Sequence, residues 1–310
     1  MIKIDVGEER ADVGIALSAW PYSRWIAALA RQSLIAEVEL TPKPGLVDRR
    51  GSGAHTDLSL ATMKQSASAI EPYFREMAEA SQDNYPCSDL RQLLGILGRN
   101  AELAMLKATG GSNAHKGSIW TLGLLISAAA MLESLSPSAS HIALRAREIA
   151  LLEDRAMPYL VTNGEAVLKR YGVTGARGEA RDGFPHIVHL ALPMLRRERS
   201  RGMQEEVARL NTLLVIMSKL DDTCLLHRGG ERALTAAKRG AISVLEAGGV
   251  ATELGSQNLS LLDGRLLEMK ISPGGSADLL AATLFLDAVE RNQPQILTTP
   301  DWWRFASGNN

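Results

Sequence analysis

Residues 117–132 of the chain read GSIWTLGLLISAAAML, a stretch without any charged side chain. Within it Ile119, Leu122, Ile126 and Ala129 recur at steps of three and four residues, which is the period of one helix face. The stretch is too short to span a bilayer, because a spanning helix needs about 20 apolar residues. We therefore predict a helix buried in the core, ending before Pro137.

The same helical period recurs along most of the chain. Strand-like alternation is nearly absent, and aromatic residues make up only 5% of the sequence. No repeat, low-complexity tract or long linker interrupts the pattern, so the sequence predicts an all-α fold, a single domain of about ten helices over residues 1–310. Besides the opening stretch and a stripe over residues 63–77, the helical stretches lie near residues 17–39, 89–109, 138–156, 202–227, 231–247, 251–269 and 273–290.

The two ends of the chain differ from this helical body. The first dozen residues are largely polar, so we expect residues 1–14 to be loosely ordered. Residues 294–310 contain Trp302, Trp303 and Phe305, whose large apolar area predicts a tail that docks on the body.

The composition narrows the class of protein. The chain has 310 residues, 45% apolar and 22% charged, with a formal net charge of −1. The chain has no excess of basic residues, so its charge does not predict binding to nucleic acid or to an anionic membrane. Cys87 and Cys224 show neither metal-ligand spacing nor a disulfide framework, and the N-terminus has no signal pattern, so we expect a cytoplasmic protein.

Polar residues gather in the breaks between the predicted helices. If neighbouring helices are antiparallel, several of these breaks fall at one end of the bundle, where they would form a polar pocket with glycine-lined walls. The breaks are residues 41–48, 53–57, 110–117, 175–179, 220–230 and 272–278.

Asp221 and Asp222 follow directly on an apolar helical stretch. Leu214 and Met217 precede Asp221 at three- and four-residue steps, so its carboxylate is predicted to lie on the buried stripe. A buried carboxylate is costly unless a cation, a metal or hydrogen bonds compensate it. The segment therefore predicts a metal site; an N-cap or an internal ion pair with Arg228 is the alternative.

The break at residues 272–278 is a candidate anion site. Ser272 followed by Pro273 predicts a helix start, with serine as the N-cap and proline at the first helical position. Gly274, Gly275 and Ser276 would then leave free N–H groups for an anion. A capped helix that packs tightly is the alternative.

The break at residues 110–117 has a similar composition. Asn113 or Ser112 could cap the following helix, while His115 and Lys116 would point at a ligand over its N-terminus. The order of a Walker A loop is absent, and a solvated lysine is the alternative to phosphate binding.

Three further loops carry candidate groups, each with a structural alternative. Lys43 lies between two prolines, which would present it rigidly to a phosphate or simply end a helix. His55 and Asp57 could ligate a metal, share a proton or form a loop hydrogen bond. Arg177 and Glu179 lie between glycines and could equally form an exposed turn.

The remaining histidines and a basic run receive a structural interpretation. His141, His186 and His189 lie in amphipathic or loop contexts with no acidic partner nearby in the sequence. The arginines of residues 196–201 are most simply a solvated helix end and turn.

Taken together, the breaks resemble the triphosphoribosyl-dephospho-coenzyme A synthases that serve citrate lyase and malonate decarboxylase. The match keeps the family order over about residues 30–290, and the lead-in at residues 49–53 resembles the malonate decarboxylase branch. Ala114, Cys224 and Ser59 depart from the family pattern. The matching segments are Glu37-Val38, residues 41–48, 53–57, 115–117, 175–180, 183–185, 221–223, 226–230 and 272–278.

The resemblance implies an all-α enzyme that joins ATP to 3′-dephospho-CoA, inverts the anomeric centre and releases adenine. The product would be the precursor of a prosthetic group that a further transferase attaches to an acyl carrier protein. A single displacement needs a base for the attacking hydroxyl, a donor for the leaving adenine and negative charge near the oxocarbenium-like centre, by analogy with inverting glycoside chemistry. The triphosphate needs Mg²⁺ and cations.

The candidate roles under this resemblance divide into three groups. The predicted Mg²⁺ ligands are Asp221 and Asp222, with Glu37 as a further acid. Glu179 or Asp57 is the predicted general base, and His115 is the predicted donor to adenine. The substrate-binding candidates are Lys43, His55, Lys116, Arg177, His227, Arg228 and the amides of Gly274, Gly275 and Ser276.

Two other functions remain as alternatives. The same acids and lysines could serve an ATP-dependent phosphoryl or nucleotidyl transferase, although the Walker A, kinase and Rossmann patterns are absent. A non-catalytic helical scaffold that binds dephospho-CoA predicts an exposed apolar face instead of a polar pocket. The sequence leaves open whether the protein forms a homodimer.

Overall fold

Helix α5 (Lys116–Met131) is buried along most of its length, as its uncharged sequence predicts. The structure is a computed structural model that describes residues 21–156 and 162–291. Helices α2 (Tyr22–Glu39), α3 (Leu60–Ser81), α4 (Ser88–Ala108), α6 (Ala139–Leu151) and α13 (Gly274–Arg291) all pack against α5. Leu122, Leu125 and Ile126 are fully buried in this core.

The predicted all-α fold is confirmed. The described residues form twelve α-helices and no β-strand; an isolated bridge joins Asp48 and Gly51. The remaining helices are α7 (Asn163–Tyr171), α8 (Gly175–Arg181), α9 (Leu192–Ser200), α10 (Glu205–Lys219), α11 (Thr223–Glu246) and α12 (Glu253–Glu268), with a 3₁₀ turn η1 (Glu133–Leu135) and a π-helix η2 (Ile187–Ala191).

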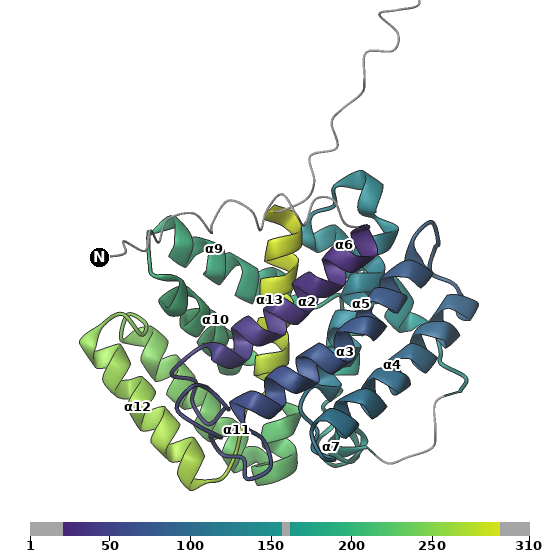
Figure 1. The fold of residues 1–310 in the computed structure, drawn as a ribbon. Coiled ribbons are helices and arrows are strands. Elements are labelled where there is room, and N and C mark those ends of the chain that lie inside the picture. Colours follow the sequence, from purple (N-terminus) through teal and green to yellow (C-terminus); the bar gives the residue numbers. More distant parts are fainter. Residues whose placement is uncertain (1–20, 157–161, 292–310) are drawn as a thin grey trace, which may run out of the picture.

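Helix α13 is the second helix enclosed by the others. Leu280, Phe285 and Leu286 are fully buried, and α13 packs on α2, α5 and α10. Figure 1 shows α13, in yellow, near the centre of the view with α2 crossing it. Both buried helices begin with glycine-rich sequence, which lets polar groups from elsewhere approach their N-termini closely.

The predicted helix over residues 202–227 is wrong in its end point. Helix α10 stops at Lys219 and α11 begins at Thr223, because Asp222 takes an extended conformation and its side chain accepts a hydrogen bond from the amide of Cys224. The sequence predicts a break between helices at Gly229-Gly230. In the structure this position is a kink within α11, where Gly230 has φ 62°.

Three short helices were not predicted. Helices α7, α8 and α9 together with η2 fill residues 163–200, where the apolar stripe is too short to give a clear period. Helix α7 is capped by local polar side chains, since Thr162 and Glu165 form a capping box at its start.

Some predictions about the chain fall elsewhere. The loose N-terminal segment, residues 1–14, and the docking tail, residues 294–310, lie outside the described residues. Among the helices that the structure describes, none has both the length and the apolarity that crossing a bilayer requires.

Candidate active site

Helices α5, α11 and α13 begin close together. Asp222, which caps α11, accepts hydrogen bonds from the amides of Gly275 at 3.3 Å and Ser276 at 2.8 Å, at the start of α13. Asp278, one turn further along α13, accepts a short hydrogen bond from the hydroxyl of Ser118 in the first turn of α5. The expectation that polar breaks gather at one place therefore holds for these three helix starts.

Asp222 is a structural cap whose lone pairs are largely used. Its Oδ1 accepts from the amide of Cys224 at 2.9 Å, and its Oδ2 also accepts from the Ser276 hydroxyl at 2.9 Å. Burial raises the pKa of Asp222, while the hydrogen bonds from Ser276, Cys224 and Gly275 oppose the rise. The helix-cap alternative for this acid is confirmed.

The amides at the start of α13 are not free, which corrects the predicted anion site. Gly275 and Ser276 donate to Asp222, and the amide of Gly274 donates to the carbonyl of Ser272 at 2.9 Å. The hydroxyl of Ser272, predicted as the N-cap, is buried without a hydrogen-bond partner. A carboxylate from α11 thus takes the place that the sequence assigned to Ser272 or to a phosphate.

The predicted burial of Asp221 is wrong. Its side chain is 55% exposed, and its Oδ1 lies 2.5 Å from the Nζ of Lys238. The helical period that would have buried Asp221 no longer applies, because α10 ends two residues earlier at Lys219. Its partner is Lys238 and not Arg228, which was the ion-pair alternative.

The lysine between the two prolines is buried in an ion pair. Lys43 is 1% exposed, and its ammonium makes a short contact with the carboxylate of Glu37, at the end of α2. Burial raises the pKa of Glu37, and the charge of Lys43 opposes the rise. Each group compensates the other, so neither is free in this structure for the phosphate or the metal role that the sequence suggested.

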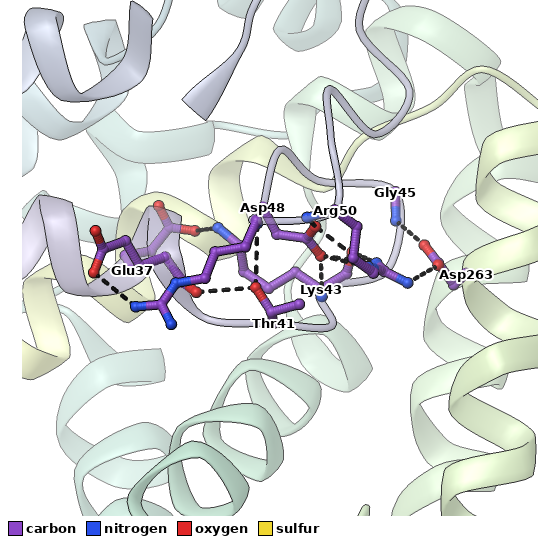
Figure 2. A network of polar contacts seen from close by, with 9 residues as sticks. Glu37, Thr41, Lys43, Gly45, Asp48, Arg50 and Asp263 are labelled. Atoms are coloured by element: carbon purple, nitrogen blue, oxygen red, sulfur yellow. Dashed lines mark hydrogen bonds and ion pairs between the residues drawn. The ribbon is translucent and has the colours of Figure 1, made fainter. Parts of the chain in front are cut away.

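The loop that carries Lys43 is fixed to α12 by a polar network (Figure 2). Asp48 accepts from the backbone amide of Lys43 at 2.9 Å, and Arg50 bridges Asp48 at 2.8 Å and Asp263 at 2.7 Å. Asp263 also accepts from the amide of Gly45 at 2.9 Å. The loop therefore has one defined shape, held by carboxylates of the loop itself and of α12.

His115 is buried with one ring nitrogen unsatisfied. Its Nδ1 lies 2.7 Å from the hydroxyl of Ser66 on α3, and its Nε2 has no hydrogen-bond partner. Burial, with a smaller contribution from the charge of Lys43, lowers the pKa of His115 to about 3. The imidazole is thus neutral near pH 7, and a buried nitrogen without a partner is the group that a bound ligand would satisfy.

Asp278 is the acid in this region that the sequence reasoning missed. Asp278 is only partly exposed, and its burial raises its pKa to about 7. The nearby negative charges of Glu37 and Asp222 contribute to this rise. It approaches α5 so closely that a Cβ on Gly117 would lie 2.0 Å from its Oδ2. The signal was present in the sequence, as a glycine two residues after His115 and an acid one turn after a helix start.

Glu179 has a partner that the sequence reasoning dismissed. Its Oε2 lies 2.7 Å from Nδ1 of His186, and its Oε1 accepts from the backbone amide of His186 at 3.0 Å. The prediction that His186 has no acidic partner is therefore wrong. Helix α8, which carries Glu179, begins beside the start of α11. The two are so close that a Cβ on Gly175 would lie 2.8 Å from the side chain of Thr223.

The other predicted site residues lie nearer the surface. His55 Nδ1 lies 3.6 Å from Asp57 Oδ1, beyond hydrogen-bond distance, and burial together with the nearby Arg228 lowers the pKa of His55. His227 and Arg228 are exposed on α11. Exposed ion pairs join Lys116 to Glu102 at 2.8 Å and Arg177 to Glu165 at 3.5 Å.

Each of the predicted magnesium ligands has a partner within the protein. Glu37 is paired with Lys43, Asp221 with Lys238, and Asp222 with backbone amides. In the part of the chain that the structure describes, no group of three or more histidine, cysteine or acidic side chains is arranged to hold a metal ion. The residues present do not form a metal cage of their own.

A separate cavity of about 330 Å³ opens between α11 and α12. Its lining contains none of the predicted site residues. The lining residues are Glu231, Arg232, Thr235, Ala236, Arg239 and Arg265.

Comparison with known proteins assigns the chain to a family. The family model described as ATP:dephospho-CoA triphosphoribosyl transferase (CitG) matches residues 23–296. The chain belongs to this family. Its members are transferases, and the resemblance drawn from the separate motifs is thereby confirmed.

Curated relatives cover most of the chain. A Pseudomonas fluorescens Pf-5 protein is 53% identical over 86% of this chain and 91% of its own length. A Pseudomonas aeruginosa PAO1 protein is 54% identical over 84% of this chain and 89% of its own length. Both carry the name probable 2-(5''-triphosphoribosyl)-3'-dephosphocoenzyme-A synthase.

A solved structure shares the fold. The crystal structure of a candidate triphosphoribosyl-dephospho-CoA synthase from Archaeoglobus fulgidus is 19% identical to this chain, with a TM-score of 0.50. The match covers 73% of this chain and 97% of the archaeal one. At that identity the likeness supports the architecture alone.

The buried ion pair makes the first prediction. Replacing Lys43 by alanine should lower the free energy of unfolding by about 3–5 kcal/mol at pH 7, because it leaves the Glu37 carboxylate buried without a cation. The loss should shrink as the pH falls and Glu37 becomes neutral. The double change E37Q/K43M, which removes both charges, should recover most of it in urea titrations. A K43A variant within about 0.5 kcal/mol of the unaltered chain would contradict the pairing.

The second prediction concerns the close approach of Asp278 to α5. Gly117→Ala should displace the Asp278 carboxylate, and we expect lower thermal stability and impaired adenine release. Gly264→Ala is the matched control, because a Cβ on Gly264, also inside a helix, meets nothing within 4 Å. That change should raise helix propensity and leave activity intact. Equal behaviour of the two variants would show that the close approach has no consequence.

Proposed function

We propose that the chain transfers the triphosphoribosyl group of ATP to 3′-dephospho-CoA and releases adenine. The observation that carries the proposal is the sequence match to relatives named for this product, at just over half identity along most of the chain. The geometry supports it, since the separated motifs supply a neutral buried donor, several carboxyl groups and exposed cations around the starts of α5, α11 and α13.

The departing adenine is assigned to His115. Because its pKa is far below neutrality, the imidazole cannot act as a cation at pH 7. It can instead donate a hydrogen bond from Nε2, if Ser66 donates to Nδ1 and fixes that tautomer. A neutral donor supports the charge that develops on adenine as the glycosidic bond breaks, without adding a positive charge beside Lys43.

The ribose carbon gains positive character during the displacement, and carboxyl groups lie near the proposed path. Asp278 is the one that is partly exposed, and its pKa near 7 makes its charge responsive to bound ligand. We assign it the electrostatic role at this centre. Of the two acids predicted for the base role, we favour the site at Glu179, which is buried on α8, over Asp57, whose side chain is 54% exposed.

Recognition of the triphosphate falls to the exposed cations. Lys43 is committed to Glu37, and the amides of Gly275 and Ser276 to Asp222. We therefore place the phosphates near Arg228, with Lys116 and His227 as further candidates. Since residues 21–156 and 162–291 offer no metal cage, we propose that Mg²⁺ enters as part of the substrate, bound mainly by phosphate oxygens.

The product chemistry suggests the setting of the enzyme. A triphosphoribosylated dephospho-CoA is an activated prosthetic group, so a second transferase must consume it and attach it to an acyl carrier protein. We propose the malonate decarboxylase system for this role, on the resemblance of residues 49–53, with citrate lyase as the alternative. A cytoplasmic location and a homodimer remain proposals.

Incubation of the purified chain with ATP, Mg²⁺ and dephospho-CoA tests the proposed function. Chromatography should show free adenine only when both substrates are present. ADP as the product would favour phosphoryl transfer and pyrophosphate would favour nucleotidyl transfer. Binding without any product would favour a scaffold.

The triphosphate placement can be tested on α11. Arg228→Ala should raise the Michaelis constant for ATP by about tenfold or more, because a charge-assisted contact to phosphate is lost. Arg232→Ala, four residues further along α11 and also exposed, is the matched control and should leave that constant unchanged. Equal effects of the two changes would remove Arg228 from the phosphate site.

A further inference from the structure

The turn between α8 and η2 places an imidazole against a buried carboxylate. Glu179 is buried, whereas the side chain of His186 is 24% exposed. Two contacts join them, from the Nδ1 and the backbone amide of His186 to the two oxygens of Glu179, at 2.7 Å and 3.0 Å. The carboxylate thus fixes both the side chain and the main chain of the histidine.

The backbone around this pair adopts unusual conformations. Phe184 is fully buried and has φ 58°, a left-handed conformation that a residue with a Cβ rarely takes. Its amide donates to the carbonyl of Glu179 at 2.8 Å. His186 then leads directly into the π-helix η2 (Ile187–Ala191), a form found mostly as short segments and frequently at functional sites. These backbone conformations bring His186 into contact with Glu179, which lies only seven residues earlier in the chain.

The arrangement defines the tautomer of the histidine. A carboxylate 2.7 Å from Nδ1 holds the proton on that nitrogen, so Nε2 is left as an acceptor in the neutral ring. Within the described ranges, the ring of His186 forms its hydrogen bond through Nδ1 and not through Nε2. A buried acid, an oriented imidazole and a free second nitrogen together form the geometry of a general base.

The pair lies beside the junction of α10 and α11. Asp221, in that junction, and Lys238, on α11, are the other charged groups that act on His186. Asp221 is the neighbour in sequence of Asp222, the cap of the candidate site. The pair therefore borders the region to which the substrates are assigned, on the side of α8.

We propose that His186 is the general base of the transfer and that Glu179 is its positioning residue. This inference rests on the proposed function. The acceptor hydroxyl of dephospho-CoA gives its proton to Nε2, and its oxygen forms the new bond to the ribose carbon of ATP. The bond from that carbon to adenine breaks, its electron pair leaves with adenine, and adenine takes up one proton from water. The imidazolium returns its proton to water, so the protons balance.

The pH dependence follows from the neighbours of the histidine. The hydrogen bond that His186 donates to Glu179 raises the pKa of His186. Burial opposes the rise, the charge of Asp221 adds to it and the charge of Lys238 reduces it. A base must be neutral to accept a proton. The rate should therefore fall as the pH drops through a pKa that lies above the ordinary 6.5 of histidine.

Adenine release by the full chain, with matched histidine variants, tests the inference. His186→Ala should lower the rate by about 100-fold or more, as loss of a general base does, and added imidazole should restore part of it. His189→Ala, an exposed histidine in the same π-helix, should keep the full rate. An H186A variant within threefold of the unaltered chain overturns the inference, and so does a loss that imidazole does not rescue.

The second measurement does not depend on turnover. Nuclear magnetic resonance titration of His186 should give a pKa above 6.5 in the unaltered chain and a lower one in E179Q. The acidic limb of the rate profile should move to lower pH by the same amount, whereas a purely structural role would lower the rate without moving the limb. A titration unchanged by E179Q overturns the inference while the proposed function stands. An unaltered chain that releases no adenine overturns both.

Discussion

The arrangement of the site depends on one buried carboxylate. Asp222 ends the linker after α10, caps α11 and accepts from two amides and a hydroxyl at the start of α13. A carboxylate at a helix N-terminus is favourable, because the free N–H groups and the helix dipole both attract negative charge. Removing it would leave buried amides of two helices without acceptors. The separate starts of α11 and α13 are therefore held as one unit.

The same interaction recurs one step further into the core. Asp278, carried by α13, meets the first turn of α5 through Ser118, and the absence of a side chain on Gly117 permits the approach. The loop around Lys43 is fixed independently by Asp48 and Asp263. Most acids of the site are thus used in contacts that stabilise the fold. His115, Asp278 and the Glu179–His186 pair are the groups that we assign to the substrates.

The fold was readable from sequence wherever burial is continuous. The uncharged stretch of α5 predicts a helix buried in the core, as the structure shows. The order of the motifs also led to the correct family. The break at Asp222 was not readable, because the apolar period of residues 210–217 gives no sign of ending until the cap forms. The partners of Asp278 lie 160 residues away in the chain, and His186 reaches Glu179 only through the left-handed Phe184. Such contacts are set by tertiary packing, which a local pattern does not encode.

Two of the three departures from the family pattern have a local structural role. Ser59 caps α3 through a reciprocal capping box with Thr62, so its hydroxyl is used in folding. Cys224 lies where its sulfur would be 3.0 Å from a Cβ on Gly274, and burial with the nearby Asp222 raises the pKa of its thiol. That thiol is therefore a packing group and not a nucleophile.

A crystal structure with ATP, Mg²⁺ and a dephospho-CoA analogue lacking the attacking hydroxyl tests the central claim most directly. The account predicts adenine within hydrogen-bond distance of Nε2 of His115, and the ribose carbon between that histidine and the Glu179–His186 pair. ATP bound instead in the cavity between α11 and α12, against Arg232 and Arg239, would contradict it.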